Sequence, residues 1–213
     1  MKAHMLAFFI AVLLLAGCSG IKVIPQQVPQ GVVNLSDNSQ TVAKDGVSIT
    51  VANSNTEMVS YNLDGTVTAF VVTIDNQSPR EIGFDAGSFV LLDDQNRQYL
   101  PLTPEKVKEL MSRDSYYLIP YPYVGFYYLE DYERTSFYNT TESQLPYYYE
   151  VYPQDIQTRA LAADPVIPGA KTTGLVYFRI DLGAVKEVKL FIYRSGSSKS
   201  AAPDFLFPFV VGK

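Results

Sequence analysis

Cys18 is the residue of this 213-residue chain whose surroundings most directly predict a chemical modification. It is the only cysteine, so the chain offers no second thiol for an internal disulfide. The residues Leu15-Ala16-Gly17 precede it, and small residues before a cut let a segment enter a peptidase as an extended strand. A thiol at such a point can form a thioether with diacylglycerol. We therefore expect cleavage before Cys18 and lipid on its sulfur.

The residues before Cys18 are organised like an export signal. Lys2 supplies a positive charge, and residues 5–15 form an unbroken apolar run. This run is shorter than the roughly 20 residues that span a bilayer, but it suits the apolar core of a signal peptide. Together with it, Leu15-Ala16-Gly17-Cys18 resembles the lipobox of bacterial lipoproteins. The resemblance implies that residues 1–17 are a signal peptide and that lipid on Cys18 attaches the chain to a membrane.

Ser19 bears on which membrane the resemblance implies. In Gram-negative lipoproteins, an aspartate directly after the lipidated cysteine resembles a signal for retention in the inner membrane. This chain has serine there. The expected location is therefore the cell envelope, and the outer membrane if the source is Gram-negative.

The composition argues against several classes of function. A formal net charge of -5 disfavours nucleic acid, which is bound by basic surfaces. The only histidine, His4, lies in the predicted signal peptide, so the predicted mature chain has neither histidine nor a free thiol. Serine triads and hydrolytic zinc sites depend on such side chains. We expect a protein that is not an enzyme and has no cofactor.

Two acidic segments are candidate metal sites, and neither has the expected spacing. Calcium loops place oxygen ligands at alternating positions, often with a glycine at the turn. Asp93-Asp94 lacks this pattern, as does the cluster of Glu130, Asp131 and Glu133. We expect no bound metal, and solvated loops at both places.

Residues 115–153 contain 12 of the 16 tyrosines and several prolines. Tyrosine combines a large ring, few rotatable bonds and a polar tip, and is favoured at binding surfaces. The candidate surface for an envelope protein or glycan consists of Tyr121, Tyr123, Tyr127 and Tyr128. The alternative is that these rings only pack the segment onto the rest of the domain.

The remaining chain is dominated by strand patterns. In residues 66–75, Phe70, Val72 and Ile74 share one face, because side chains alternate across a strand. Residues 93–97 are turn formers between two such runs and predict a hairpin. One helix is expected after Thr103 as its cap, with Val107 on its apolar face. The other predicted strands are 47–51, 89–92, 98–102, 176–180 and 188–192.

Short alternating strands with one helix predict an antiparallel β-sandwich. The segments that carry a family resemblance are 70–76, 89–93, Tyr99, 167–169 and 176–178. They resemble small bacterial lipoproteins with one immunoglobulin-like domain of unknown function. The expected division is a signal peptide (1–17), a tether (18–43), an immunoglobulin-like sandwich (44–194) with a Tyr/Pro-rich insertion (114–164), and a linker with an apolar C-terminal segment (195–213).

These observations predict a lipid-anchored binding or scaffold protein of the cell envelope. Two alternatives stay open. Paired carboxylates could hydrolyse envelope polysaccharide without histidine. Alternatively, residues 205–211 could dock on a partner, which would make the chain a structural subunit of a surface or export complex.

Overall fold

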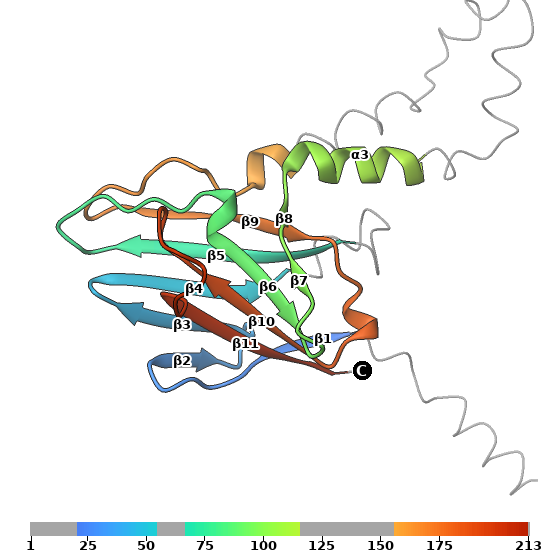
Figure 1. Ribbon diagram of the computed structural model, residues 1–213, viewed down its shortest axis with the longest axis horizontal. Helices are drawn as coiled ribbons and strands as arrows, with labels where there is room; N and C mark the ends of the chain where they lie inside the picture. Colours follow the sequence, from blue (N-terminus) through green and yellow to red (C-terminus); the bar gives the residue numbers. More distant parts are fainter. Residues whose placement is uncertain (1–20, 55–66, 116–155, 213) are drawn as a thin grey trace, which may run out of the picture.

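The computed structural model describes residues 21–54, 67–115 and 156–212, which form a sandwich of two antiparallel sheets (Figure 1). In spatial order, one sheet contains β1 (Lys22–Pro25), β11 (Phe205–Gly212), β10 (Glu187–Ile192), β6 (Phe89–Asp93) and β7 (Gln98–Tyr99). The second contains β2 (Gly31–Asn34), β3 (Ser39–Lys44), β4 (Val47–Asn53), β5 (Thr68–Asn76), β9 (Lys171–Phe178) and β8 (Pro101–Leu102). The predicted β-sandwich is confirmed.

The central strands have the order of an immunoglobulin domain. Strands β4-β5-β9-β8 correspond to A-B-E-D of that fold, and β11-β10-β6-β7 correspond to G-F-C with one further strand. The chain therefore passes from one sheet to the other between β7 and β8, which are separated only by Leu100. The Tyr/Pro-rich insertion falls in the connection between strands D and E.

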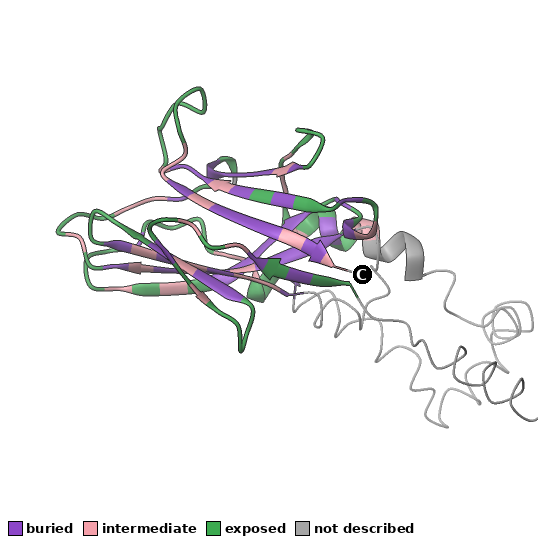
Figure 2. Ribbon diagram, turned by 90° about the horizontal axis from the view of Figure 1, so that it is seen from below, coloured by how far each residue is buried: buried purple, intermediate pink, exposed green. Residues whose placement is uncertain are grey.

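The core lies between the two sheets and follows the predicted alternation. Phe70, Val72 and Ile74 of β5 are all buried in it. Phe70 packs against Phe209 of the opposite sheet with ring centroids 5.3 Å apart. Figure 2 shows buried residues along the strands and exposed residues mainly in the turns. Burial of these apolar side chains between the sheets stabilises the sandwich, which contains no disulfide.

A second apolar cluster covers the outer face of β5 and β9. Helix α3 (Pro104–Ser115) supplies Val107, which is fully buried against Ala69 and Tyr177. Thr103 caps this helix as predicted, because its hydroxyl accepts a hydrogen bond from the backbone N–H of Lys106 at 3.3 Å. The flank of the insertion that the structure describes before residue 116 therefore packs on the sandwich.

The flank after residue 155 packs on the same face. The hydroxyl of Tyr177 donates to the carbonyl of Ile156 at 3.1 Å, and the N–H of Leu161 bonds to the carbonyl of Leu175. The chains approach so closely that a Cβ on Gly174 would lie 2.3 Å from the Cα of Leu161. Glycine is therefore required at position 174 for this approach.

Two predicted boundaries were wrong. Residues 22–44, expected to lie mostly in a tether, contain β1, β2 and β3, and β3 pairs along its whole length with β4. Residues 205–211, expected to form a separate apolar segment, belong to β11, which pairs with both β1 and β10. Its Phe205, Phe207 and Phe209 are buried in the core, so they are not available to dock on a partner.

Pro208 explains why β11 is hard to recognise, since proline rarely occupies the interior of a sheet. It lies one residue past the last pair between β1 and β11, Pro25↔Phe209. Its carbonyl accepts a hydrogen bond from the N–H of Gln26 at 2.8 Å. The carbonyl of Gln26 is satisfied by the side-chain amide of Gln40 at 2.6 Å, so the missing proline N–H leaves no unpaired acceptor there.

Candidate functional site

The two ends of the sandwich each carry a cavity that charged side chains border. We call one the β1 end: it comprises the start of β1, the 93–97 turn and the 3-10 helix η3 (Leu182–Ala184). We call the other the Arg194 end: it comprises the 45–46 turn, residues 78–83 and residues 194–199. The two lie at opposite ends of β5 and β10, and the C-terminus marks the β1 end in Figure 1.

Asp93 organises the β1 end. Its side chain is fully buried, and its carboxylate accepts hydrogen bonds from the backbone N–H groups of Gln95 and Arg97, each at 2.9 Å. It also accepts from Nε of Arg97 at 2.6 Å and from the hydroxyl of Tyr99 at 3.0 Å. These bonds fold the predicted hairpin turn, in which Asn96 adopts a positive φ of 58°.

The hydrogen bonds decide the charge of Asp93. Burial alone raises the pKa of its carboxyl, but the bonds donated by Arg97, Tyr99 and Gln95 favour the ionised form more strongly. The pKa consequently falls from its ordinary value of 3.8 to about 2. Asp93 holds no proton at neutral pH and has its acceptors filled, so it is suited neither to general acid catalysis nor to holding a cation.

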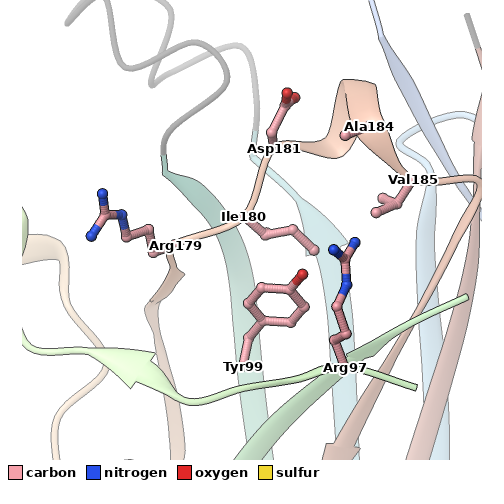
Figure 3. Close-up of a pocket in the computed structure, with 7 residues that line it drawn as sticks. All are labelled: Arg97, Tyr99, Arg179, Ile180, Asp181, Ala184 and Val185. Atoms are coloured by element: carbon pink, nitrogen blue, oxygen red, sulfur yellow. The ribbon is translucent and has the colours of Figure 1, made fainter. Parts of the chain in front are cut away.

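A cavity of about 410 Å³ lies beside this network. Figure 3 shows Arg97 and Tyr99 on the β7 side of it, with Arg179 and Asp181 on the connection that leads to η3. Nε of Arg97 is held by Asp93, while Arg179 makes no ion pair or side-chain hydrogen bond among the described residues. The carboxylate of Asp181 caps η3 by accepting from the N–H of Gly183 at 2.7 Å.

The Arg194 end is shaped by two turns with clear sequence causes. Asp45 and Gly46 form the two-residue hairpin between β3 and β4, both with positive φ, as expected for Asp-Gly. The buried Asn76 fixes the second turn, which follows β5. Its amide donates to the carbonyls of Arg80 and Val166, and its oxygen accepts from the backbone and hydroxyl of Ser78.

Arg194 lies where these turns meet. Its guanidinium carbon is 5.9 Å from the centroid of the Phe205 ring, and one terminal nitrogen is 3.4 Å from the carboxylate of Asp45. Its Nε is buried and has no hydrogen-bond partner in the described structure. The ring of Phe205 and the carboxylate of Asp45 thus position Arg194, but they do not fill all of its hydrogen-bond donors.

Two cavities meet at Arg194 and Ser195, and we call them together the Arg194 groove. One, of about 360 Å³, includes Asp45, Ser78 and Arg80, and the other, of about 180 Å³, includes Asp85 and Lys199. Arg80 makes no ion pair or side-chain hydrogen bond among the described residues. Guanidinium groups with free donors bind carboxylate and phosphate oxygens well. The groove can therefore accept an acidic group.

The residues singled out from sequence lie mostly elsewhere. Cys18 and the tyrosines Tyr121, Tyr123, Tyr127 and Tyr128 lie outside the described residues, as do Glu130, Asp131 and Glu133. Asp94 is exposed, whereas its neighbour Asp93 belongs to the turn network. Within the described ranges, no three His, Cys, Asp or Glu side chains are grouped so that they could hold a metal ion.

The Arg194 groove was not among the sites predicted from the sequence. Arg194 and Asp45 are 149 positions apart, and only the antiparallel pairing of distant strands brings them together. The available signals were the Asp-Gly turn and the Asn76-Gln77-Ser78-Pro79 turn, which indicated two loops but not that they meet.

No protein-family model matches this chain, and no curated protein or solved structure matches it significantly. Among the described helices, none is long and apolar enough to cross a membrane.

Proposed function

We propose that this chain is a lipid-anchored, non-enzymatic binding or scaffold module of the bacterial cell envelope, attached to a membrane through lipid on Cys18. The observation that carries the proposal is the position of the fold relative to that cysteine. The first strand, β1, begins at Lys22, and every helix and strand that the structure describes follows it. Cleavage before Cys18 would therefore remove no residue of the described sandwich.

The proposed ligand contact is the Arg194 groove. The side chain of Arg194 is 30 % exposed, and its ion pair with Asp45 is 3.4 Å long, so its terminal guanidinium nitrogens can meet an acceptor from a ligand. Arg80 supplies a second cation at the same cavity. An acidic group on an envelope protein or glycan has the required chemistry. The tyrosine surface formed by Tyr121, Tyr123, Tyr127 and Tyr128 remains a second predicted contact.

The anchor is tested by Cys18→Ser in the full chain, expressed in a bacterium. A serine hydroxyl cannot form the thioether, and each buried lipid CH₂ contributes about 0.8 kcal/mol to membrane binding. The variant should move from the membrane fraction to the soluble fraction, while the control Ser36→Ala stays with the membrane. If Cys18→Ser partitions into detergent like the unchanged protein, the anchor is wrong.

The ligand contact is tested by capture of envelope components with the lipidated protein. Arg194→Gln keeps a polar side chain but removes the cation, and it should reduce capture. Lys189→Gln is the matched control, because Lys189 is an exposed cation on β10 away from the groove. Equal loss in both variants would mean that only overall charge matters.

A further inference from the structure

The distance between the proposed lipid and the sandwich is short. Ile21 already lies on the β1 end, because a Cβ built on Gly183 of η3 would be 3.4 Å from its Cδ1. Lys22 then pairs with Gly212 at the edge of the sheet. Only three residue steps separate Ile21 from Cys18, and an extended chain covers at most about 11 Å in three steps. This inference rests on the proposed lipidation.

A link this short leaves the sandwich little freedom. Lipid on Cys18 would keep the β1 end next to the headgroups, so even weak contacts there would be populated, because tethering raises the effective concentration. The nine residues of β5 rise about 3.3 Å each, which puts the Arg194 end about 30 Å further along the strands.

The charges of the β1 end are mixed rather than basic. Among the residues that the structure describes there, the cations are Lys22, Arg97, Arg179 and Lys186, and the exposed carboxylates are Asp94, Asp181 and Glu187. Because the whole chain has a net charge of -5, no strong attraction to an anionic surface is expected. A zwitterionic phospholipid, which carries a phosphate and an ammonium group side by side, matches this surface better.

The cavity beside η3 has the size and the groups for such a headgroup. Its volume of about 410 Å³ lies within the usual range for small-molecule sites. Arg179 is free to meet a phosphate, and the terminal nitrogens of Arg97 make no other hydrogen bond among the described residues. Asp181 borders the same cavity, and the carboxylate oxygen that does not cap η3 is left to meet the ammonium group.

We propose that the sandwich contacts the membrane with its β1 end, and that the cavity of Arg97, Arg179 and Asp181 binds zwitterionic phospholipid headgroups. In this orientation the strands point away from the bilayer. The Arg194 groove then opens on the side away from the membrane, where a soluble or neighbouring envelope partner can reach it.

The test uses the lipidated full chain in phosphatidylethanolamine–phosphatidylcholine vesicles, with a nitroxide on some headgroups. Because Cys18 is the only cysteine, an added cysteine is the only free thiol once Cys18 is lipidated. A fluorophore is placed through Gln95→Cys at the β1 end, or through Ser197→Cys at the Arg194 end. Both are exposed turn residues whose side chains make no hydrogen bond within the described ranges. In each, it is the backbone N–H that bonds within the turn.

Strong quenching at position 95 with none at position 197 is expected. In the Gln95→Cys background, Arg179→Gln should weaken the quenching, whereas Lys171→Gln at the other end of β9 should leave it unchanged. Equal quenching at both positions, or stronger quenching at 197, would overturn the orientation. No change with Arg179→Gln would overturn the headgroup contact.

Failure of the anchor itself would look different. Two fluorophores per chain, together with no flotation on vesicles, would mean that Cys18 is free and that the proposed function is wrong. One fluorophore per chain with flotation confirms the anchor, and the quenching pattern then decides the orientation alone.

Discussion

The β1 end and the Arg194 end each hold a charged side chain beside a cavity, but the two charges have different surroundings. The carboxylate of Asp93 is fully buried and accepts four hydrogen bonds. The side chain of Arg194 is 30 % exposed, its ion pair with Asp45 is 3.4 Å long, and its Nε is unpaired. A saturated charge serves the fold, whereas an unsaturated one is available to a ligand. The two ends therefore predict opposite outcomes when the charge is removed.

The largest effect expected from removing a charge is on stability at the β1 end. Asp93→Ala removes the acceptor of four hydrogen bonds, and bonds to charged groups are the more valuable ones, so we expect a loss of about 2–4 kcal/mol in the free energy of unfolding. Urea unfolding at neutral pH measures it. Asp94→Ala is the matched control and should change stability by no more than about 0.5 kcal/mol, because Asp94 is exposed. Similar values for the two variants would mean that the network does not stabilise the turn.

The same carboxylate predicts a pH dependence. The pKa of Asp93 is about 2 in the folded protein against an ordinary 3.8, so the unfolded chain binds this proton more readily. Its contribution is complete above about pH 4–5 and is lost as the pH falls towards 2, a total of about 2 kcal/mol. The difference in urea midpoint between the unchanged protein and Asp93→Asn should shrink over that range. A difference that is constant from pH 6 to pH 3 would contradict this.

Removal of the charge at the Arg194 end should cost little stability. A partly exposed ion pair and one cation–π contact are each worth about 0.5–1 kcal/mol, so Arg194→Gln should lower the free energy of unfolding by no more than about 1–2 kcal/mol. Thermal melting measures it alongside envelope capture, which should fall. A large loss of stability without a change in capture would make Arg194 a structural residue like Asp93.

The smallest expected effect on stability concerns the tyrosine surface. If its rings point outward, changing Tyr127 and Tyr128 together to alanine should alter the free energy of unfolding by no more than about 0.5 kcal/mol per site and should weaken capture. The contrast is with Tyr177, whose buried ring should cost about 3–5 kcal/mol when replaced by alanine. A loss of that size at positions 127 and 128 would show that these rings only pack.

Local patterns were sufficient wherever one element contained its own signal. The alternation in residues 66–75 anticipated the buried face of β5, the 93–97 turn formers anticipated the β6–β7 hairpin, and Thr103 anticipated the cap of α3. In each case the determining interaction joins residues close in sequence or follows from the two-residue period of a strand. The sandwich class followed from the number and spacing of such segments.

Long-range pairing accounts for what the local patterns missed. The four-residue strands β1 and β2 are too short for a periodic signal, and Pro208 disguises β11. Whether a segment is a tether or a strand depends on partners such as Gly212 for Lys22, which lie at the other end of the chain. The contact between Arg194 and Asp45 in the groove also depends on residues far apart in the sequence. It forms because the turn between β3 and β4 lies on the same side of the sandwich as the end of β10. The four bonds to Asp93 come from residues within six positions of it, but its burial and the surroundings of Arg194 are properties of that packing and not of residue type.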